Sequence, residues 1–249
     1  MKQTAASISC PAPAQIEHKA CGKAAFRPRD PSHHVGDLFG FEEATHGDLG
    51  LARINVPQLK LESPSLNIEW QTSLMNEMPN QILSKKVDLS IAALPVVHDH
   101  LHSQAFMRGR MVVVMAGDHP LAQQPVLSLQ QLEGQPLLLF RPDMPFGQLL
   151  AQQIEHRGLH LHSLLSFTNA VEAVALVKQG MGLSIIDEFV AQDSGLTVVP
   201  LAEEIYFDIS FVYSRFEPPS QAALHLMRVL RAQAVNVGRA IAGFELPNP

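Results

Sequence analysis

Short apolar runs alternate along this chain with segments whose hydrophobic residues recur every three or four positions. The runs predict strands, and the helical spacing predicts helices between them. The expected strands are 38–43, 66–71, 89–93, 103–115 (broken near Gly109), 136–140, 161–167, 182–187, 196–200 and 206–213. The expected helices are 48–61, 74–85, 127–132, 146–157, 169–179 and a last one that Ser220 caps and whose apolar stripe continues to Ile241. This alternation favours mainly parallel sheets and an α/β fold.

The most informative segment is 166–187, which predicts a strand end, a capped helix, a glycine turn and another strand. Asn169 is a suitable N-cap, and Glu172 completes a capping-box pattern. Gly180 suits a left-handed C-cap. The free N–H groups of this helix would face the space beyond the strand ends, where an anion or polar ligand can bind.

This segment resembles the second-lobe signature of the effector-sensing domain of LysR-type transcription regulators. Four further segments resemble that family in order and spacing. They are Val87–Ala92, Phe106–Ala122 with its Asp118-His119-Pro120 turn, Val126–Leu132, and Pro136–Phe140. The resemblance covers about 38–235.

The resemblance implies a two-lobed fold like that of type 2 periplasmic binding proteins, each lobe a mainly parallel sheet flanked by helices. Lobe I would hold 37–95 and 204–249, lobe II would hold 98–202, and crossovers near 96–98 and 202–204 would form a hinge. Residues 1–36 lack periodicity, so we expect an irregular segment rather than the family's winged helix-turn-helix. The chain would then be a sensor fragment or the product of a gene that lost its DNA-binding part.

Ligands of open α/β sheets bind beyond the carboxyl ends of the strands. Here this rule selects the turns after four predicted strands. The candidate effector-binding residues are Thr45, His46, Leu94, Pro95, Arg141, Phe146, Thr168 and Asn169. The resemblance implies effector contacts at Thr45 and at Thr168 with Asn169.

Simpler roles stay open for these residues. Thr45 fits an ordinary turn, and Thr168 with Asn169 fits a helix cap. Arg141 suits a carboxylate ligand or a solvated loop. Glu42 and Glu43 depart from the family pattern and fit either an amine-binding edge of the cleft or a distorted strand.

Other chemistry has little support in the sequence. His98, His100 and His102 alternate, but with only Asp99 beside them we expect a polar loop and no metal. We expect no cofactor and no enzyme activity, because glycine-rich phosphate loops and nucleophile-elbow motifs are missing. A small-molecule enzyme on this fold, requiring turnover of some amine or acid, stays a less favoured hypothesis.

Charge and composition limit the partners. The net charge of −6 divides into +2 for residues 1–37 and −8 for the remainder, so we expect no direct DNA binding by this chain alone. The two cysteines, Cys10 and Cys21, and the lack of a secretory signal or an 18-residue apolar run predict a cytoplasmic protein without membrane contact.

The favoured hypothesis is therefore a sensing domain that binds a small metabolite, with an organic or amino acid expected. The resemblance implies an isologous homodimer in which one helix of each lobe pairs with a second subunit. The alternative is a solute-binding protein of the same fold that serves transport.

Overall fold

The computed structural model describes residues 38–42, 61, 69–73, 76–93 and 96–247. Its strands follow one another in the order β2-β1-β3-β9-β4-β7-β5-β6, and β8 pairs with β4. The strands are β1 (Leu38–Glu42), β2 (Glu69–Ser73), β3 (Leu89–Ala93), β4 (Leu101–Met115), β5 (Leu137–Phe140), β6 (Ser163–Phe167), β7 (Leu183–Asp187), β8 (Thr197–Pro200) and β9 (Tyr206–Ser214).

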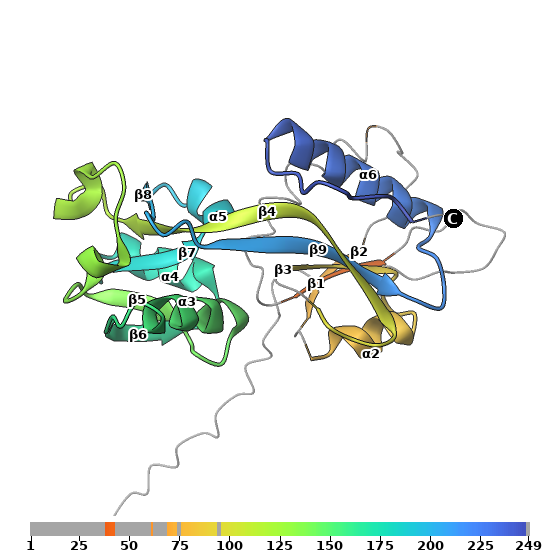
Figure 1. Ribbon diagram of the computed structural model, residues 1–249, viewed down its shortest axis with the longest axis horizontal. Coiled ribbons are helices and arrows are strands. Elements are labelled where there is room, and N and C mark those ends of the chain that lie inside the picture. The colour runs from red at the N-terminus through yellow and green to blue at the C-terminus, as the bar shows by residue number, and fades with distance from the viewer. Residues whose placement is uncertain (1–37, 43–60, 62–68, 74–75, 94–95, 248–249) are drawn as a thin grey trace, which may run out of the picture.

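Two sheets form the frame of the molecule (Figure 1), and β4 belongs to both. Sheet A contains β2, β1, β3, β9 and the first part of β4; sheet B contains the last part of β4 with β7, β8, β5 and β6. The outer strands run parallel, whereas β4 and β9 pair antiparallel with their neighbours. Arg110 is the last β4 residue paired with β9, and Met111 is the first paired with β7.

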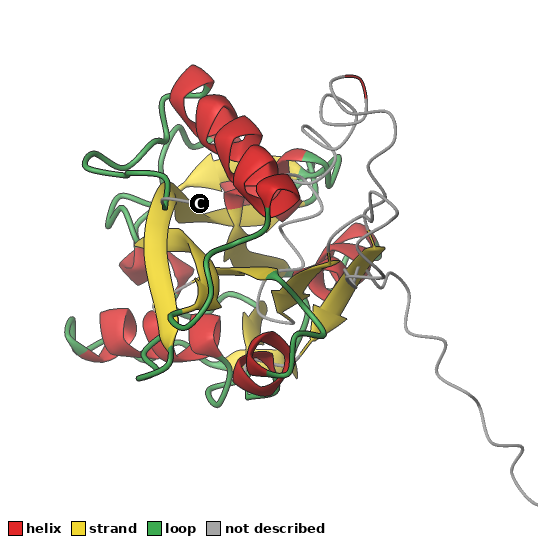
Figure 2. Cartoon of the chain, turned by 90° about the vertical axis from the view of Figure 1, so that its right-hand side faces the viewer, coloured by secondary structure: helices red, strands yellow, loops and turns green. Residues whose placement is uncertain are grey.

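Helices cover the sheets (Figure 2). On sheet A, alternate side chains point to opposite faces, so Ala92 and Val212 pack on α2 while Ile91 and Phe211 belong to the core beneath α6. The helices are α2 (Met78–Leu83), α3 (Pro145–Glu155), α4 (Ala170–Lys178), α5 (Glu188–Gln192) and α6 (Gln221–Asn236), with 3-10 turns η2 (Pro120–Gln123) and η3 (Leu129–Leu132).

Local sequence signals account for several helix ends. Pro145 occupies the first turn of α3, as predicted, and its fixed φ suits that place. The Asn169 side chain accepts a hydrogen bond from the Val171 amide and caps α4. Gly180 has a φ of 79°, which confirms the left-handed turn that ends α4.

The predicted break near Gly109 is wrong, because β4 is continuous from Leu101 to Met115. A Cβ at Gly109 would lie 2.5 Å from Cζ of Phe207 and 2.7 Å from Cε2 of Phe189. The glycine therefore makes room for two rings that belong to distant segments. The register irregularity of β4 lies earlier, between Ala105 and Met107.

Other predicted boundaries also change. The predicted helix 127–132 is a single 3-10 turn, and α2 begins at Met78 because Pro79 must lie in a first turn. The last helix ends at Asn236 rather than Ile241, since Gly238 has a φ of 67° and the chain then turns to pair Ala240 with Met107. The short helix α5 was not predicted.

The two sheets with their helices define the two lobes of the molecule. We call sheet A with α2 and α6 lobe I, and sheet B with α3, α4 and α5 lobe II. The predicted lobe boundaries, 37–95 with 204–249 and 98–202, stay predictions. No helix among the described residues combines the length and the apolar character needed to cross a bilayer.

Candidate functional site

Two predicted site segments lie side by side where β5 and β6 end. Phe140 is paired with Phe167 in the parallel register, and the Arg141 amide donates to the Phe167 carbonyl at 2.9 Å. This bond holds the turn at Arg141 against the turn that contains Thr168 and Asn169. The carboxyl ends of two neighbouring strands therefore bring three of the predicted residues together.

Asn169 has a structural task in this place. Its Oδ1 accepts from the Val171 amide at 2.8 Å, and the residue is half-buried, as is Thr168. Capping uses one acceptor of the Asn169 amide and leaves its NH₂ group chemically capable of a ligand contact. The cap and a ligand contact are therefore compatible roles.

The Arg141 guanidinium already has a partner. Nε lies 2.9 Å from Asp143 Oδ1, and Nη2 lies 2.6 Å from Oδ2, a two-pronged ion pair. The hydrogen bond from Arg141 holds the pKa of Asp143 below its ordinary value, and the same bond raises the pKa of Arg141. The Arg141 side chain is 53% exposed, so a ligand carboxylate would compete with Asp143 for an accessible guanidinium. Asp143, two residues further along the same turn, was the signal in the sequence that our prediction missed.

The turn from Arg141 to α3 is tightly closed. The Met144 amide donates to the Arg141 carbonyl at 3.0 Å, and a Cβ at Gly147 would lie 1.8 Å from that carbonyl oxygen. Only a glycine lets the first turn of α3 approach so closely. The position of Arg141 thus depends on Gly147.

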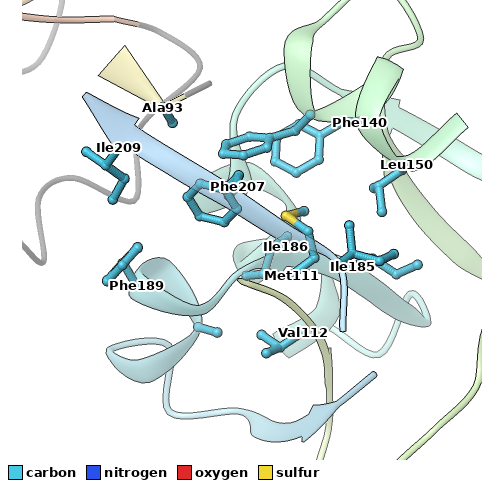
Figure 3. Packing of buried hydrophobic residues seen from close by; sticks show 14 of the residues in the cluster. Ala93, Met111, Val112, Phe140, Leu150, Ile185, Ile186, Phe189, Phe207 and Ile209 are labelled. Atoms are coloured by element: carbon cyan, nitrogen blue, oxygen red, sulfur yellow. The ribbon is translucent and has the colours of Figure 1, made fainter. Parts of the chain in front are cut away.

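Phe146 is buried at the junction of the two sheets. Its ring lies 4.9 Å from that of Phe207 on β9 and 5.3 Å from that of Phe140 on β5. Figure 3 shows Phe207 among Phe140, Phe189 and Met111, so rings from both sheets meet at this point. The contacts of Phe207 and Phe189 were not predicted from the sequence. Only the fold shows that both rings lie against Gly109.

The first-lobe candidates Thr45, His46, Leu94 and Pro95 lie outside the described residues, as does Glu43. The backbone of Glu42 ends β1, where it pairs with Ser73.

The histidines of 98–102 do not converge on one point. The His98 and His100 rings lie 5.6 Å apart and His100 contacts Phe216, while His102 lies against Tyr213. Within the part of the chain that the structure describes, no group of three or more His, Cys, Asp or Glu side chains is placed to hold a metal ion.

Asp187, at the end of β7, is a buried acid that the sequence did not single out. Its Oδ1 accepts from the amides of Phe189 and Val190 at 3.1 and 3.0 Å and caps α5. Burial raises the pKa of this carboxyl to about 6 despite these bonds. The group therefore titrates well above an ordinary aspartate.

Comparison with known proteins decides the family. The model of the LysR substrate binding domain matches residues 56–235. This chain belongs to that family. The match confirms the resemblance and covers most of the chain.

Individual relatives agree with this assignment. The chain is 21% identical over 178 residues to the HTH-type transcriptional regulator YvbU of Bacillus subtilis (strain 168), covering 68% of this chain and 58% of the relative. The chain therefore spans little more than half the length of that regulator. Relatives are named as transcriptional regulators, and the LysR substrate-binding domain is a regulatory domain rather than an enzyme.

Solved structures confirm the fold. The effector-binding domain of BenM with its effector benzoate is 18% identical, with a TM-score of 0.72, covering 85% of this chain and 97% of that domain. The regulatory domain of Synechocystis PCC6803 CcmR in complex with 2-PG is 15% identical, with a TM-score of 0.65, covering 80% of this chain and 96% of that domain. The chain therefore has the two-lobed fold of type 2 periplasmic-binding-protein-like domains.

Proposed function

We propose that this LysR substrate-binding domain senses a small metabolite, an organic or amino acid, which binds between the two lobes. The observation that carries the proposal is the alignment of the Arg141 and Thr168 turns by the bond from the Arg141 amide to the Phe167 carbonyl. Arg141, Thr168 and Asn169 therefore lie at the same sheet edge. They carry a guanidinium, a hydroxyl and an amide, a set suited to a carboxylate ligand.

The similar structures support this proposal by their ligands. BenM's domain holds benzoate, a carboxylate, and that of CcmR holds 2-PG. In an intact regulator the ligand would change the angle between the lobes and the spacing of the DNA-binding parts. We further propose that the chain acts in the cytoplasm, forms a homodimer and binds no DNA by itself.

The test is a thermal-shift screen against carboxylates, amino acids and amines, followed by calorimetry on the ligands that raise the Tm. Arg141→Ala should weaken binding of a carboxylate ligand by about tenfold or more, because the charged partner is lost. Asp143→Asn should strengthen the same binding, because it frees the guanidinium from its internal partner.

Arg157→Ala is the matched control, since Arg157 is an exposed arginine whose side chain bonds Gln153 near the end of α3. It should bind the ligand as the unmodified chain does. Equal affinity in Arg141→Ala and Arg157→Ala would exclude Arg141 from the site. A screen in which no acid raises the Tm would argue against sensing of this ligand class.

A further inference from the structure

The carboxylate of Glu188 is nearly buried and bonds to residues of both lobes. The Glu188 side chain is only 5% exposed. Its Oε1 accepts from the Arg110 amide at 3.1 Å, and its Oε2 accepts from Arg110 Nε at 3.2 Å and from Arg239 Nη2 at 2.5 Å. One buried anion thus lies between two guanidinium groups.

The three residues come from different parts of the fold. Glu188 begins α5, directly after β7 of sheet B. Arg110 is the last residue by which β4 pairs in sheet A. Arg239 lies in the segment after α6, which belongs to lobe I.

The segment that carries Arg239 is fixed to sheet A. The Arg108 amide donates to the Arg239 carbonyl at 2.9 Å, and Ala240 pairs with Met107. Arg231 of α6 donates to the carbonyls of Phe106 and Ile241, which ties helix, strand and segment together. Arg239 must therefore move with lobe I.

A rotation of lobe II against lobe I would act unequally on these bonds. Arg110 adjoins Met111, where β4 passes from one sheet to the other, and so lies close to the pivot. Arg239 lies on the lobe I side of it. Turning α5 away would separate Glu188 from Arg239 first and leave a poorly paired carboxylate in a buried place, which is costly.

We propose that Glu188, Arg110 and Arg239 form an inter-lobe clasp that holds the two lobes at one mutual angle. The Arg239–Glu188 contact is the part that opens when the lobes rotate. Its use in signalling rests on the proposed ligand sensing, whereas the clasp itself can be tested without any ligand.

The test compares Arg239→Gln with Asp208→Asn in the full chain. Asp208 forms a two-pronged pair with Arg108 at 2.7 and 3.3 Å, but this pair lies on neighbouring strands of sheet A and does not join the lobes. Asp208→Asn therefore removes one arginine–carboxylate pair within a single lobe, although this pair is more exposed than the Arg239–Glu188 pair. Spin labels at Cys substitutions of exposed Glu155 on α3 and exposed Arg228 on α6 report the inter-lobe distance, with Cys10 and Cys21 replaced by Ser.

With no ligand present, Arg239→Gln should broaden or shift the distance distribution, and the Arg110 amide should exchange about tenfold faster with solvent deuterium. Asp208→Asn should leave both unchanged. Glu188→Gln keeps the size of the side chain but removes its charge, and it should change the distance distribution and the Arg110 exchange rate as Arg239→Gln does. If circular dichroism shows that Glu188→Gln fails to fold, the result for Arg239→Gln alone decides. A distribution and an exchange rate in Arg239→Gln that equal those of Asp208→Asn would refute the clasp.

Discussion

At the scale of single residues, Asp187 combines two opposed effects. Two backbone amides stabilise its charge, but complete burial disfavours that charge more strongly and raises the pKa from 3.8 to about 6. Between about pH 4 and pH 6 the folded chain therefore binds more protons at this group than the unfolded chain does. Stability contributed by Asp187 must fall as the pH rises through this window.

Asp187→Asn should remove that dependence, because an amide oxygen can still accept from Phe189 and Val190 without carrying charge. Relative to the variant, the unmodified chain should lose about 2 kcal/mol of stability between pH 4 and pH 7. Urea unfolding of both proteins from pH 4.5 to about 7.5 measures the difference. Parallel stability curves would show that Asp187 stays charged throughout.

At the scale of elements, α3 depends on a glycine at each end for different reasons. Gly147 leaves room for the Arg141 carbonyl, whereas Gly158, beyond the helix, has a φ of 64° and open space where a Cβ would be. Gly147 is required because the Arg141 carbonyl lies where a side chain would be, whereas Gly158 is favoured only by its left-handed backbone conformation. The two sites therefore separate steric from conformational cost.

Gly147→Ala should destabilise the chain by about 2–4 kcal/mol, since the turn at Arg141 must move. Gly158→Ala should cost only about 1 kcal/mol, the usual penalty of a left-handed alanine. Thermal unfolding of both variants gives the comparison. Equal losses in the two variants would mean that the Arg141 turn yields easily and does not position the guanidinium.

At the scale of the whole molecule, the two lobes share one continuous frame of strands. β4 passes from one sheet to the other, and β9 pairs with its sheet A part. Arg110 of β4 takes part in the proposed clasp, and Phe207 of β9 contacts Phe146 of α3. Domain motions in such folds occur at a few positions that link the halves. In this chain β4 changes its pairing partner from β9 to β7 between Arg110 and Met111, and we expect any such motion to be centred there.

We expect the molecule to assemble as an isologous dimer, through α2 of one subunit and α3 of the other. Light scattering after size exclusion should give about twice the 27.3 kDa of one chain. Asn80→Arg, which places charge on the exposed face of α2, should lower the mass toward one chain. Gln221→Arg changes an exposed position at the start of α6 and should leave the dimer mass unchanged. A monomer mass for the unmodified chain and for both variants would contradict the dimer.

Local rules were sufficient where a feature depends on neighbouring residues. The order of most strands and helices, the Asn169 cap, Pro145 in the first turn of α3 and the left-handed Gly180 followed from the sequence, because periodicity and capping act over a few positions. The sequence also placed Arg141, Thr168 and Asn169 at strand ends. The hydrogen bond from the Arg141 amide to the Phe167 carbonyl shows that these two strand ends are adjacent.

Only the tertiary structure decided what distant segments do to one another. Gly109 appeared to interrupt a strand until Phe207 and Phe189 filled the space that it leaves. Glu188 meets Arg110 and Arg239 across 78 and 51 residues of chain, and such pairings have no period in the sequence. The cost of burying a charge or a side-chain volume depends on what surrounds it, and folding alone brings those surroundings together.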